Sequence, residues 1–402
     1  MSMSKKVSKT ALLVSLVLSN GIYAEEGDFD TAMKGSETKL SFRARYEMVD
    51  QEGLAEKANA ITNRTRLTFA SKSFGKWKLN LEMDNVSALT NDYNSTANGQ
   101  AAYPVVADPE GTDLNQANLV YSDGDLKAII GRQRINIGSQ RLVGGVGWRQ
   151  NEQTYDGVLV SYKINDNFNA AYAYIDNVNR IFGPTGGNAD VWGANHVINA
   201  NYKLDDNHSF AFTSVMIDLD NAAGLSTDTH SLEYKGKYDN ADWTVGFATQ
   251  SDAGLAPVAY TADYSLFEFN YKFEAVSVGF GIETLGSDNG VRAFITPLAT
   301  LHKFQGFADK FAAGTPNAGV EDTYFKVGGK LNDINLSLTY HQLDADFGGG
   351  SYGTEIDIAA SYSISKTYGL LVKYADYQAD ANAGGAQGTD VSKLWVMFTA
   401  NF

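Results

Sequence analysis

The sequence of 402 residues contains no cysteine and only 6 prolines. Without cysteine, the chain can form no disulfide framework, no thiolate metal site and no cysteine nucleophile. Outside a short stretch near the N-terminus it has no uninterrupted apolar run of about 18 residues, so we expect no membrane-spanning helix. Basic side chains number 32 against 47 acidic ones, and the net charge of -15 would repel a phosphate backbone. Nucleic acid is therefore not an expected partner.

Aromatic residues are plentiful, since Phe, Trp and Tyr make up 12% of the chain. This content supports a folded protein and excludes intrinsic disorder. The first 24 residues are typical of a secretory signal peptide. Three lysines precede a short apolar run at residues 11–18, and the small residue Ala24 stands at the expected cleavage point. We therefore expect a signal peptide at residues 1–24 and a mature domain at residues 25–402.

Beyond residue 36, the sequence repeats segments in which apolar and polar side chains alternate. In the first segment Leu40, Phe42 and Ala44 fall on one face, whereas Ser41 and Arg43 fall on the other. This alternation is typical of a transmembrane β-strand with one face toward lipid and one toward water. We predict eighteen strands, at residues 37–48, 60–71, 75–87, 112–122, 125–135, 152–163, 166–178, 193–204, 207–218, 227–238, 241–252, 261–272, 274–285, 319–331, 333–343, 352–363, 366–378 and 390–402.

Short and long connections alternate between these segments. The tight ones, such as 123–124 and 205–206, consist of Asp, Asn and Gly, which tolerate the backbone angles of hairpin turns. Alternation of this kind is typical of an outer-membrane barrel with short periplasmic turns and long extracellular loops. The last segment alternates up to a terminal Phe402, as is common in such barrels. We predict an all-β, transmembrane antiparallel β-barrel in the cell outer membrane, in contact with lipid and lipopolysaccharide, either alone or as a trimer.

Arginine is concentrated in the first part of the chain. Eight of the ten arginines precede residue 150, and three pairs have the spacing i, i+2 that places both members on one strand face. A charge facing lipid at mid-depth costs about 2 to 4 kcal/mol, so we expect these pairs to face the lumen. The direction in which the side chains of strands 125–135 and 152–163 point is less certain. The apolar residues Ala128 and Ile130 fall on the same face as Arg132 and Arg134, and Val158 falls on the same face as Asp156. The candidate pore-lining residues are Arg43, Arg45, Arg64, Arg66, Glu82, Asp84, Arg132 and Arg134.

This arginine group has two interpretations. A basic patch at a constriction would favour anionic or polyhydroxylated solutes. Alternatively, the arginines pair with neighbouring carboxylates and stiffen the wall of the barrel. For a single arginine the two interpretations are equally good, and the clustering favours selectivity.

Two further segments resemble the signatures of the alginate-export family of outer-membrane channels. The first comprises Gly131-Arg132-Gln133, Arg141-Leu142-Val143-Gly144, Trp148-Arg149-Gln150 and Tyr155-Asp156. The second comprises Thr296-Pro297-Leu298, His302-Lys303-Phe304 and the segment 306–311. The resemblance implies an eighteen-stranded barrel whose arginine-rich lumen passes an anionic uronate polysaccharide. It also implies that Arg132, Arg134, Arg141 and Arg149 line the pore.

The chain departs from that family at two points. Phe307 stands where the resemblance leads us to expect Trp, and every predicted periplasmic turn is too short to plug the barrel. We therefore expect a porin-like channel for the passive passage of small polar or anionic solutes, including uronate-type saccharides. Export of an alginate-like polysaccharide is the alternative within the same class.

A barrel enzyme and a structural or adhesive barrel are the alternatives of another class. The sequence has no G-x-S-x-G, H-E-x-x-H or P-loop motif, and its five histidines do not pair at metal-ligand spacing. We accordingly expect no enzymatic activity, no cofactor and no metal site.

Overall fold

The computed structural model describes residues 26–402, which form a short helix followed by one antiparallel sheet of eighteen strands. The expected signal peptide lies outside the described residues. Helix α2 spans Glu26–Lys34. The strands are β1 (Glu37–Gln51), β2 (Ala58–Ala70), β3 (Trp77–Ala88), β4 (Gly111–Asp123), β5 (Leu126–Gln133), β6 (Thr154–Asn165), β7 (Phe168–Asn179), β8 (Asp190–Lys203), β9 (His208–Ile217), β10 (Thr227–Tyr238), β11 (Ala241–Asp252), β12 (Thr261–Phe273), β13 (Val276–Leu285), β14 (Val320–Leu331), β15 (Ile334–Asp344), β16 (Ser351–Ser363), β17 (Tyr368–Ala379) and β18 (Val391–Asn401).

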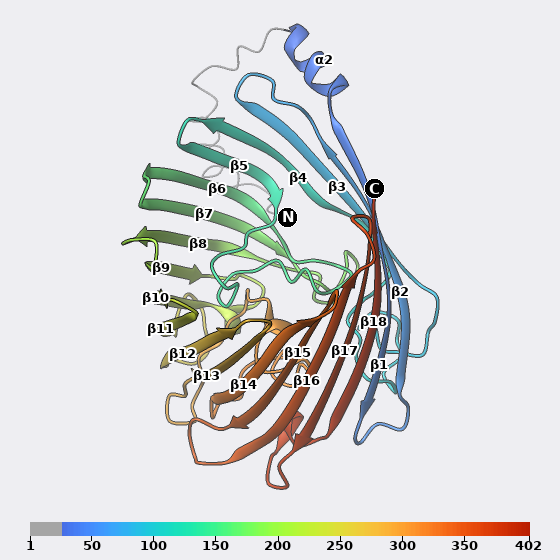
Figure 1. Ribbon diagram of the computed structural model, residues 1–402, viewed down its shortest axis with the longest axis vertical. Coiled ribbons are helices and arrows are strands. Elements are labelled where there is room, and N and C mark those ends of the chain that lie inside the picture. The colour runs from blue at the N-terminus through green and yellow to red at the C-terminus, as the bar shows by residue number, and fades with distance from the viewer. Residues whose placement is uncertain (1–25) are drawn as a thin grey trace, which may run out of the picture.

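Each strand pairs with its neighbours in sequence, and β1 pairs with β18 to close the barrel (Figure 1). The seam is hydrogen-bonded to the end of the chain, because Leu40 and Phe402 exchange backbone bonds of 3.2 and 2.8 Å. All eighteen predicted strands are confirmed, with ends that differ by a few residues. No helix in the described part of the chain is long and apolar enough to span a membrane.

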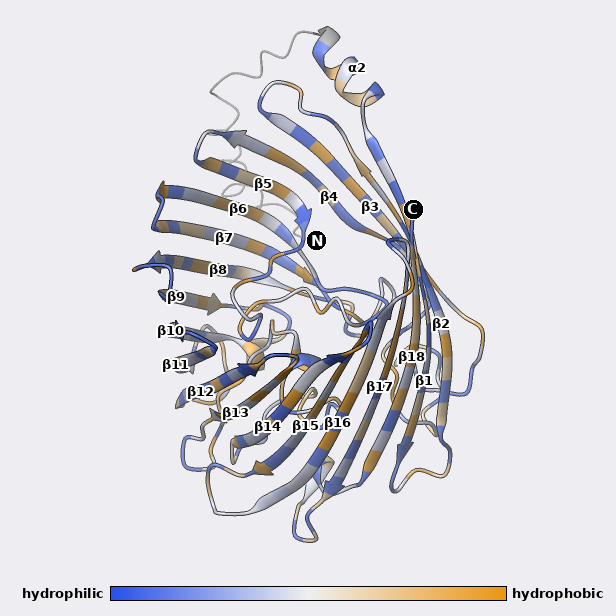
Figure 2. Ribbon diagram, in the orientation of Figure 1, coloured by the Kyte–Doolittle hydropathy of each residue, from blue (hydrophilic) through white to orange (hydrophobic). Residues whose placement is uncertain are grey.

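The two faces of the wall differ in polarity, as the alternating blue and orange bands of Figure 2 show. On β1, the side chains of Arg43, Arg45 and Glu47 are buried inside the barrel, whereas Leu40 is exposed. Large exposed apolar residues recur at alternate positions on the other strands. The sequence period of two thus produces an apolar outer face for lipid and a polar inner face.

Long connections fold back into the barrel, where they build a core against its inner wall (Figure 1). The β5–β6 connection, residues 134–153, meets the β13–β14 connection, residues 286–319, at a short parallel bridge between Val143 and Leu298. The amide of Gly144 donates to the carbonyl of Leu298 at 2.8 Å. Two buried apolar clusters lie beneath these connections, so the interior is partly filled rather than an open bore.

Candidate functional site

The arginines of β1 and β2 face one another across the first hairpin and are joined by carboxylates. Arg43 and Arg64 occupy directly opposite positions in the register. Arg66 binds Asp84 of β3 in a bidentate pair, with bonds of 2.7 and 2.6 Å. Glu82, two residues before Asp84, lies 3.3 Å from Arg66. The expected neighbours are therefore assembled on the inner wall, and opposite charges separate the arginines.

Glu152, in the β5–β6 connection, completes this cluster. Its carboxylate lies 3.2 Å from Arg64, 2.9 Å from Arg66 and 2.5 Å from Arg134. Burial alone would raise the pKa of Glu152, but these arginines outweigh it and hold the pKa at about 2. A single carboxylate from the connection therefore joins two arginines of β2 to one arginine of its own segment.

Arg43 and Arg45 fasten the same connection to β1. The Arg43 guanidinium donates to the Gln150 side chain at 2.9 Å, to the Gly147 carbonyl at 2.7 Å and to the Arg149 carbonyl. Arg45 lies 3.3 Å from Asp108 and stacks over the ring of Trp148 at 4.2 Å. These bonds use the guanidinium groups to hold backbone and ring atoms, which supports the wall-stiffening interpretation.

Arg149 and Arg141 reach opposite sides of the barrel. Arg149 lies 3.0 Å from Glu47 of β1, and the neighbouring carboxylates raise its pKa against the opposing effect of burial. Arg141 extends to β13, where it lies 2.9 Å from Glu283. Ion pairs thus bind the β5–β6 connection both to β1 and to β13, which lies across the lumen.

Arg132 and Arg134 do not share a face of the sheet. Arg132 pairs with Ala117 of β4, which in turn pairs with Leu81 of β3. The side chain of Leu81 is exposed on the outer face, next to the buried, inward-facing Glu82. Arg132 accordingly lies on the outer face and binds Asp156 at 2.7 and 3.0 Å. Strand β5 ends at Gln133, so Arg134 belongs to the connection and turns inward. The expectation that Arg132 faces the lumen is corrected here, since it shares the outer face with apolar neighbours.

Four of the inward arginines are largely closed off from solvent. Arg45 is 1% exposed, and Arg43, Arg64 and Arg149 are at most 8% exposed. Solvent that crosses the barrel therefore has little access to the residues that the sequence singles out most clearly.

An open cavity of about 410 Å³ lies elsewhere in the lumen, along the wall of β10 to β16. The registers align its inner residues in one row across five hairpins, because paired residues point to the same face. This row consists of Lys235, Thr244, Glu268, Gly281, Tyr324 and His341. The inward tip of the β13–β14 connection, Lys303 to Phe307, lines the opposite side of the cavity.

Sequence reasoning missed this cavity because its charged residues are spread singly over many strands. The regular alternation of β10 to β15 gives the facing of each side chain, but no short motif marks them as a group. Lys235 and His341 line the same cavity only because β10 to β15 pair in register and form one curved wall.

An aromatic and basic clamp holds the β13–β14 connection to β17 and β18. His302 stacks on Trp148 with ring centroids 4.5 Å apart, and its Nδ1 lies 2.8 Å from Asp309. Burial, reinforced by Lys373 and opposed by Asp309, lowers the pKa of His302 to about 3. The neutral ring therefore donates from Nδ1 to Asp309 and accepts at Nε2 from Lys373, which lies 2.7 Å away.

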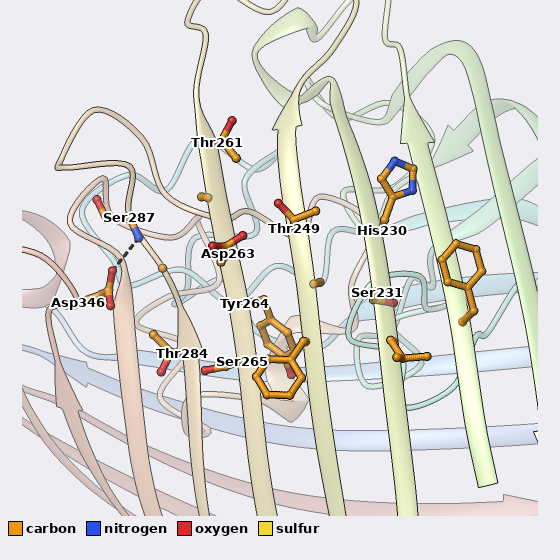
Figure 3. A pocket seen from close by; sticks show the side chains of 16 residues that line it. His230, Ser231, Thr249, Thr261, Asp263, Tyr264, Ser265, Thr284, Ser287 and Asp346 are labelled. Atoms are coloured by element: carbon orange, nitrogen blue, oxygen red, sulfur yellow. Dashed lines mark hydrogen bonds between the residues drawn. The ribbon is translucent and has the colours of Figure 1, made fainter.

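A second hollow, of about 720 Å³, lies on the outer surface of β10 to β13 (Figure 3). His230, Thr249 and Asp263 line it and are aligned by the registers with one another. They share the outer face with the exposed residues Leu232 and Phe247. These three residues therefore face away from the lumen.

Comparisons with known proteins agree with this architecture. Among solved structures, OpdO of Pseudomonas aeruginosa superposes with a TM-score of 0.72 at 13% identity, over 93% of this chain and 99% of that one. OccD3 (OpdP) of the same organism gives 0.70 at 15% identity, over 92% of each chain. OccAB4 of Acinetobacter baumannii gives 0.68 at 13% identity, over 91% of this chain and 98% of that one. These likenesses concern the fold.

No curated protein sequence matches the chain. The sequence model of the alginate export family matches residues 36–251, more than half of the chain. That range contains the first of the two segments noted in the sequence, together with the arginine cluster. The chain therefore belongs to the alginate export family and is a porin-like β-barrel of the outer membrane.

Proposed function

We propose that this barrel conducts small polar or anionic solutes passively across the outer membrane and catalyses no reaction. The observation that carries the proposal is the cavity of about 410 Å³ between the inward connections and the wall of β10 to β16. Its volume lies in the range of sites that hold small ligands. Most of its lining residues carry polar or charged groups, which suits hydrated solutes better than apolar ones.

The inward connections favour small solutes over a polymer. Residues 134–153 and 286–319 are hydrogen-bonded to each other and to the wall. A polysaccharide chain needs a continuous wide bore, and these packed segments narrow it. The family match is the observation in favour of polysaccharide export, so an oligomeric uronate belongs in the test.

The test is reconstitution of the purified protein into planar bilayers and liposomes. Stepwise ion conductance, together with liposome swelling in glucose and in sodium glucuronate, is the expected result. Swelling in an oligomeric uronate at a comparable rate would support export of a polymer instead. A protein that inserts as a folded barrel but gives neither conductance nor swelling would contradict the proposal.

A further inference from the structure

We propose that solute follows the wall of β10 to β16 and that Lys303, rather than the arginine cluster, sets the charge preference of the channel. This inference rests on the proposed channel function and deepens it by naming the specificity-determining residue. Lys303 stands at the inward tip of the β13–β14 connection and lines the lumen cavity. The wall opposite it carries a row of charged and hydroxyl side chains.

The arginine side of the lumen is closed to a passing solute. Arg43, Arg45 and Arg64 are covered by residues 134–153 and donate to backbone carbonyls, to a side-chain amide or to carboxylates. Carboxylates lie 3.3 Å from Arg45 and 3.2 Å from Arg64, well within the screening distance of about 8 Å in physiological salt. Arg43 is buried against neutral acceptors, so little of its positive charge reaches the open lumen. These arginines therefore attract an anion in the open part of the lumen only weakly.

The wall of the cavity is balanced by local ion pairs. Lys235 lies 2.9 Å from Glu233, and Lys326 lies 2.8 Å from Glu268. Glu283 is held by Arg141 across the lumen. These pairs present alternating charge without a net preference for either sign.

His341 lies between the two remaining carboxylates of the cavity. Its ring nitrogens lie 2.9 Å from Asp322 and 3.6 Å from Asp357. Asp357 also accepts the backbone amide of Phe307 at 2.9 Å. Every carboxylate that lines the cavity is therefore engaged by a cation or a donor.

Lys303 differs from the other lysines of the cavity because its ammonium lacks an anionic partner. The Nζ atom donates to the Ser139 carbonyl at 3.0 Å, and within the described residues it forms no ion pair with a carboxylate. The next residue, Phe304, places its ring 6.0 Å from Nζ. An exposed ammonium beside an aromatic ring and a carbonyl is free to bind a passing anion.

The position of Lys303 is fixed by its neighbour. His302 is buried between Trp148 and Phe307 and bonded to Asp309, so the short turn Leu301–Lys303 cannot rotate. Because adjacent side chains on this turn point in different directions, Lys303 faces the cavity. The clamp on one residue therefore holds the next in the solute path.

Glycines on β13 keep the path open opposite Lys303. A Cβ atom at Gly281 would come within 2.2 Å of the Tyr324 ring, and one at Gly279 within 2.5 Å of the Lys326 side chain. Because these positions lack side chains, Tyr324 and Lys326 lie flat against the wall. Their hydroxyl and ammonium groups form a polar surface along the route of the solute.

The test compares three variants with the wild type in planar bilayers under a gradient of KCl. Lys303→Gln removes the free charge and should reduce the permeability ratio of anion to cation by about fivefold. Lys303→Arg keeps the charge and should leave the ratio near the wild-type value. Lys57→Gln removes a charge of the same sign from the β1–β2 connection, outside the cavity, and should have no effect. Block of the current by sodium glucuronate, with glucose as the neutral control, should weaken in Lys303→Gln alone.

The outcomes separate this inference from the proposed function. A conducting wild type whose Lys303→Gln variant keeps the same permeability ratio and the same glucuronate block would overturn the role of Lys303 and leave the channel function intact. A wild type that does not conduct would overturn both. Should Lys303→Gln assemble poorly on unheated gels, Lys303→Glu provides the same comparison, with an expected reversal of preference toward cations. An unchanged ratio in that variant would also refute the inference.

Discussion

At the scale of single residues, the inner wall shows how closely spaced arginines are accommodated. Arg43 and Arg64 lie directly opposite each other, a position in which like charges repel. Glu152 resolves part of this repulsion by binding Arg64 and two further arginines. The sequence shows the arginine spacing but not this partner, since Glu152 lies in a connection with no periodic pattern. Pairs of charges on strands are predictable, whereas their counter-ions from connections depend on the fold.

Replacing Glu152 should destabilise the barrel strongly. Glu152→Gln keeps the shape of the side chain but leaves three arginines short of one negative charge, and loss of one partner in a buried ionic group costs about 3 to 5 kcal/mol. The free energy of unfolding in lipid vesicles, measured by urea titration, should fall by that amount. Glu56→Gln, at an exposed position of the β1–β2 connection, is the control and should leave the value unchanged. Equal stability of the two variants would show that Glu152 is dispensable.

The pH dependence of this stabilisation follows from the pKa of Glu152. The arginines hold the folded-state pKa at about 2, below the value of about 4.3 in an unfolded chain. The stabilisation is therefore fully present above pH 4.3 and is lost as the pH falls toward 2. The difference in unfolding free energy between wild type and Glu152→Gln should stay constant from pH 7 to pH 5 and shrink below about pH 4. A difference that shrinks between pH 7 and pH 5 would exclude Glu152 as its source.

At the scale of elements, strands and connections differ in how far the sequence determines them. The alternation of Arg43, Arg45 and Glu47 with apolar residues is local, and it predicts both the strand and its facing. The inward course of residues 134–153 depends on contacts with β1 and β13, which are distant in sequence. Arg132 shows the limit of the local rule, because its parity with Ile130 rather than its charge decides its face.

The β5–β6 connection should loosen when its principal bond to β1 is removed. Arg43→Met loses three hydrogen bonds from one guanidinium to residues 147–150. A loss of about 3 kcal/mol of local stability corresponds to hydrogen exchange that is about 100-fold faster. Mass spectrometry of peptides covering residues 144–150 measures this, since the amides of Gly145 and Gln150 are hydrogen-bonded in the folded state.

The control for this measurement is Arg180→Met, in the β7–β8 connection. Arg180 lies over the ring of Phe182 at 4.8 Å, in a connection that is separate in sequence from residues 144–150. Exchange in those residues should therefore match the wild type. If residues 144–150 exchange at the wild-type rate in Arg43→Met as well, the connection is held mainly by its other contacts.

At the scale of the whole molecule, the lumen is divided into a sealed side and an open side. Arginines, carboxylates and the β5–β6 connection fill the side of β1 to β3, whereas the cavity follows β10 to β16. Both inward connections lie at the same end of the barrel, because each follows an odd-numbered strand. The orientation typical of outer-membrane barrels assigns the connections after odd-numbered strands to the cell exterior.

Labelling of single introduced cysteines tests this orientation directly, because the native chain contains no cysteine. Ala97→Cys lies in the long β3–β4 connection, and Asp206→Cys lies in the tight β8–β9 turn, where both native side chains are exposed. A polyethylene-glycol maleimide too large to pass the channel should label Ala97→Cys on intact cells and Asp206→Cys only after the cells are broken. The ion pair of Asp206 with Lys203 is exposed to solvent and contributes little to stability, so its loss should not disturb assembly. The reverse labelling pattern would invert the barrel and place both inward connections, with Lys303, at the periplasmic entrance.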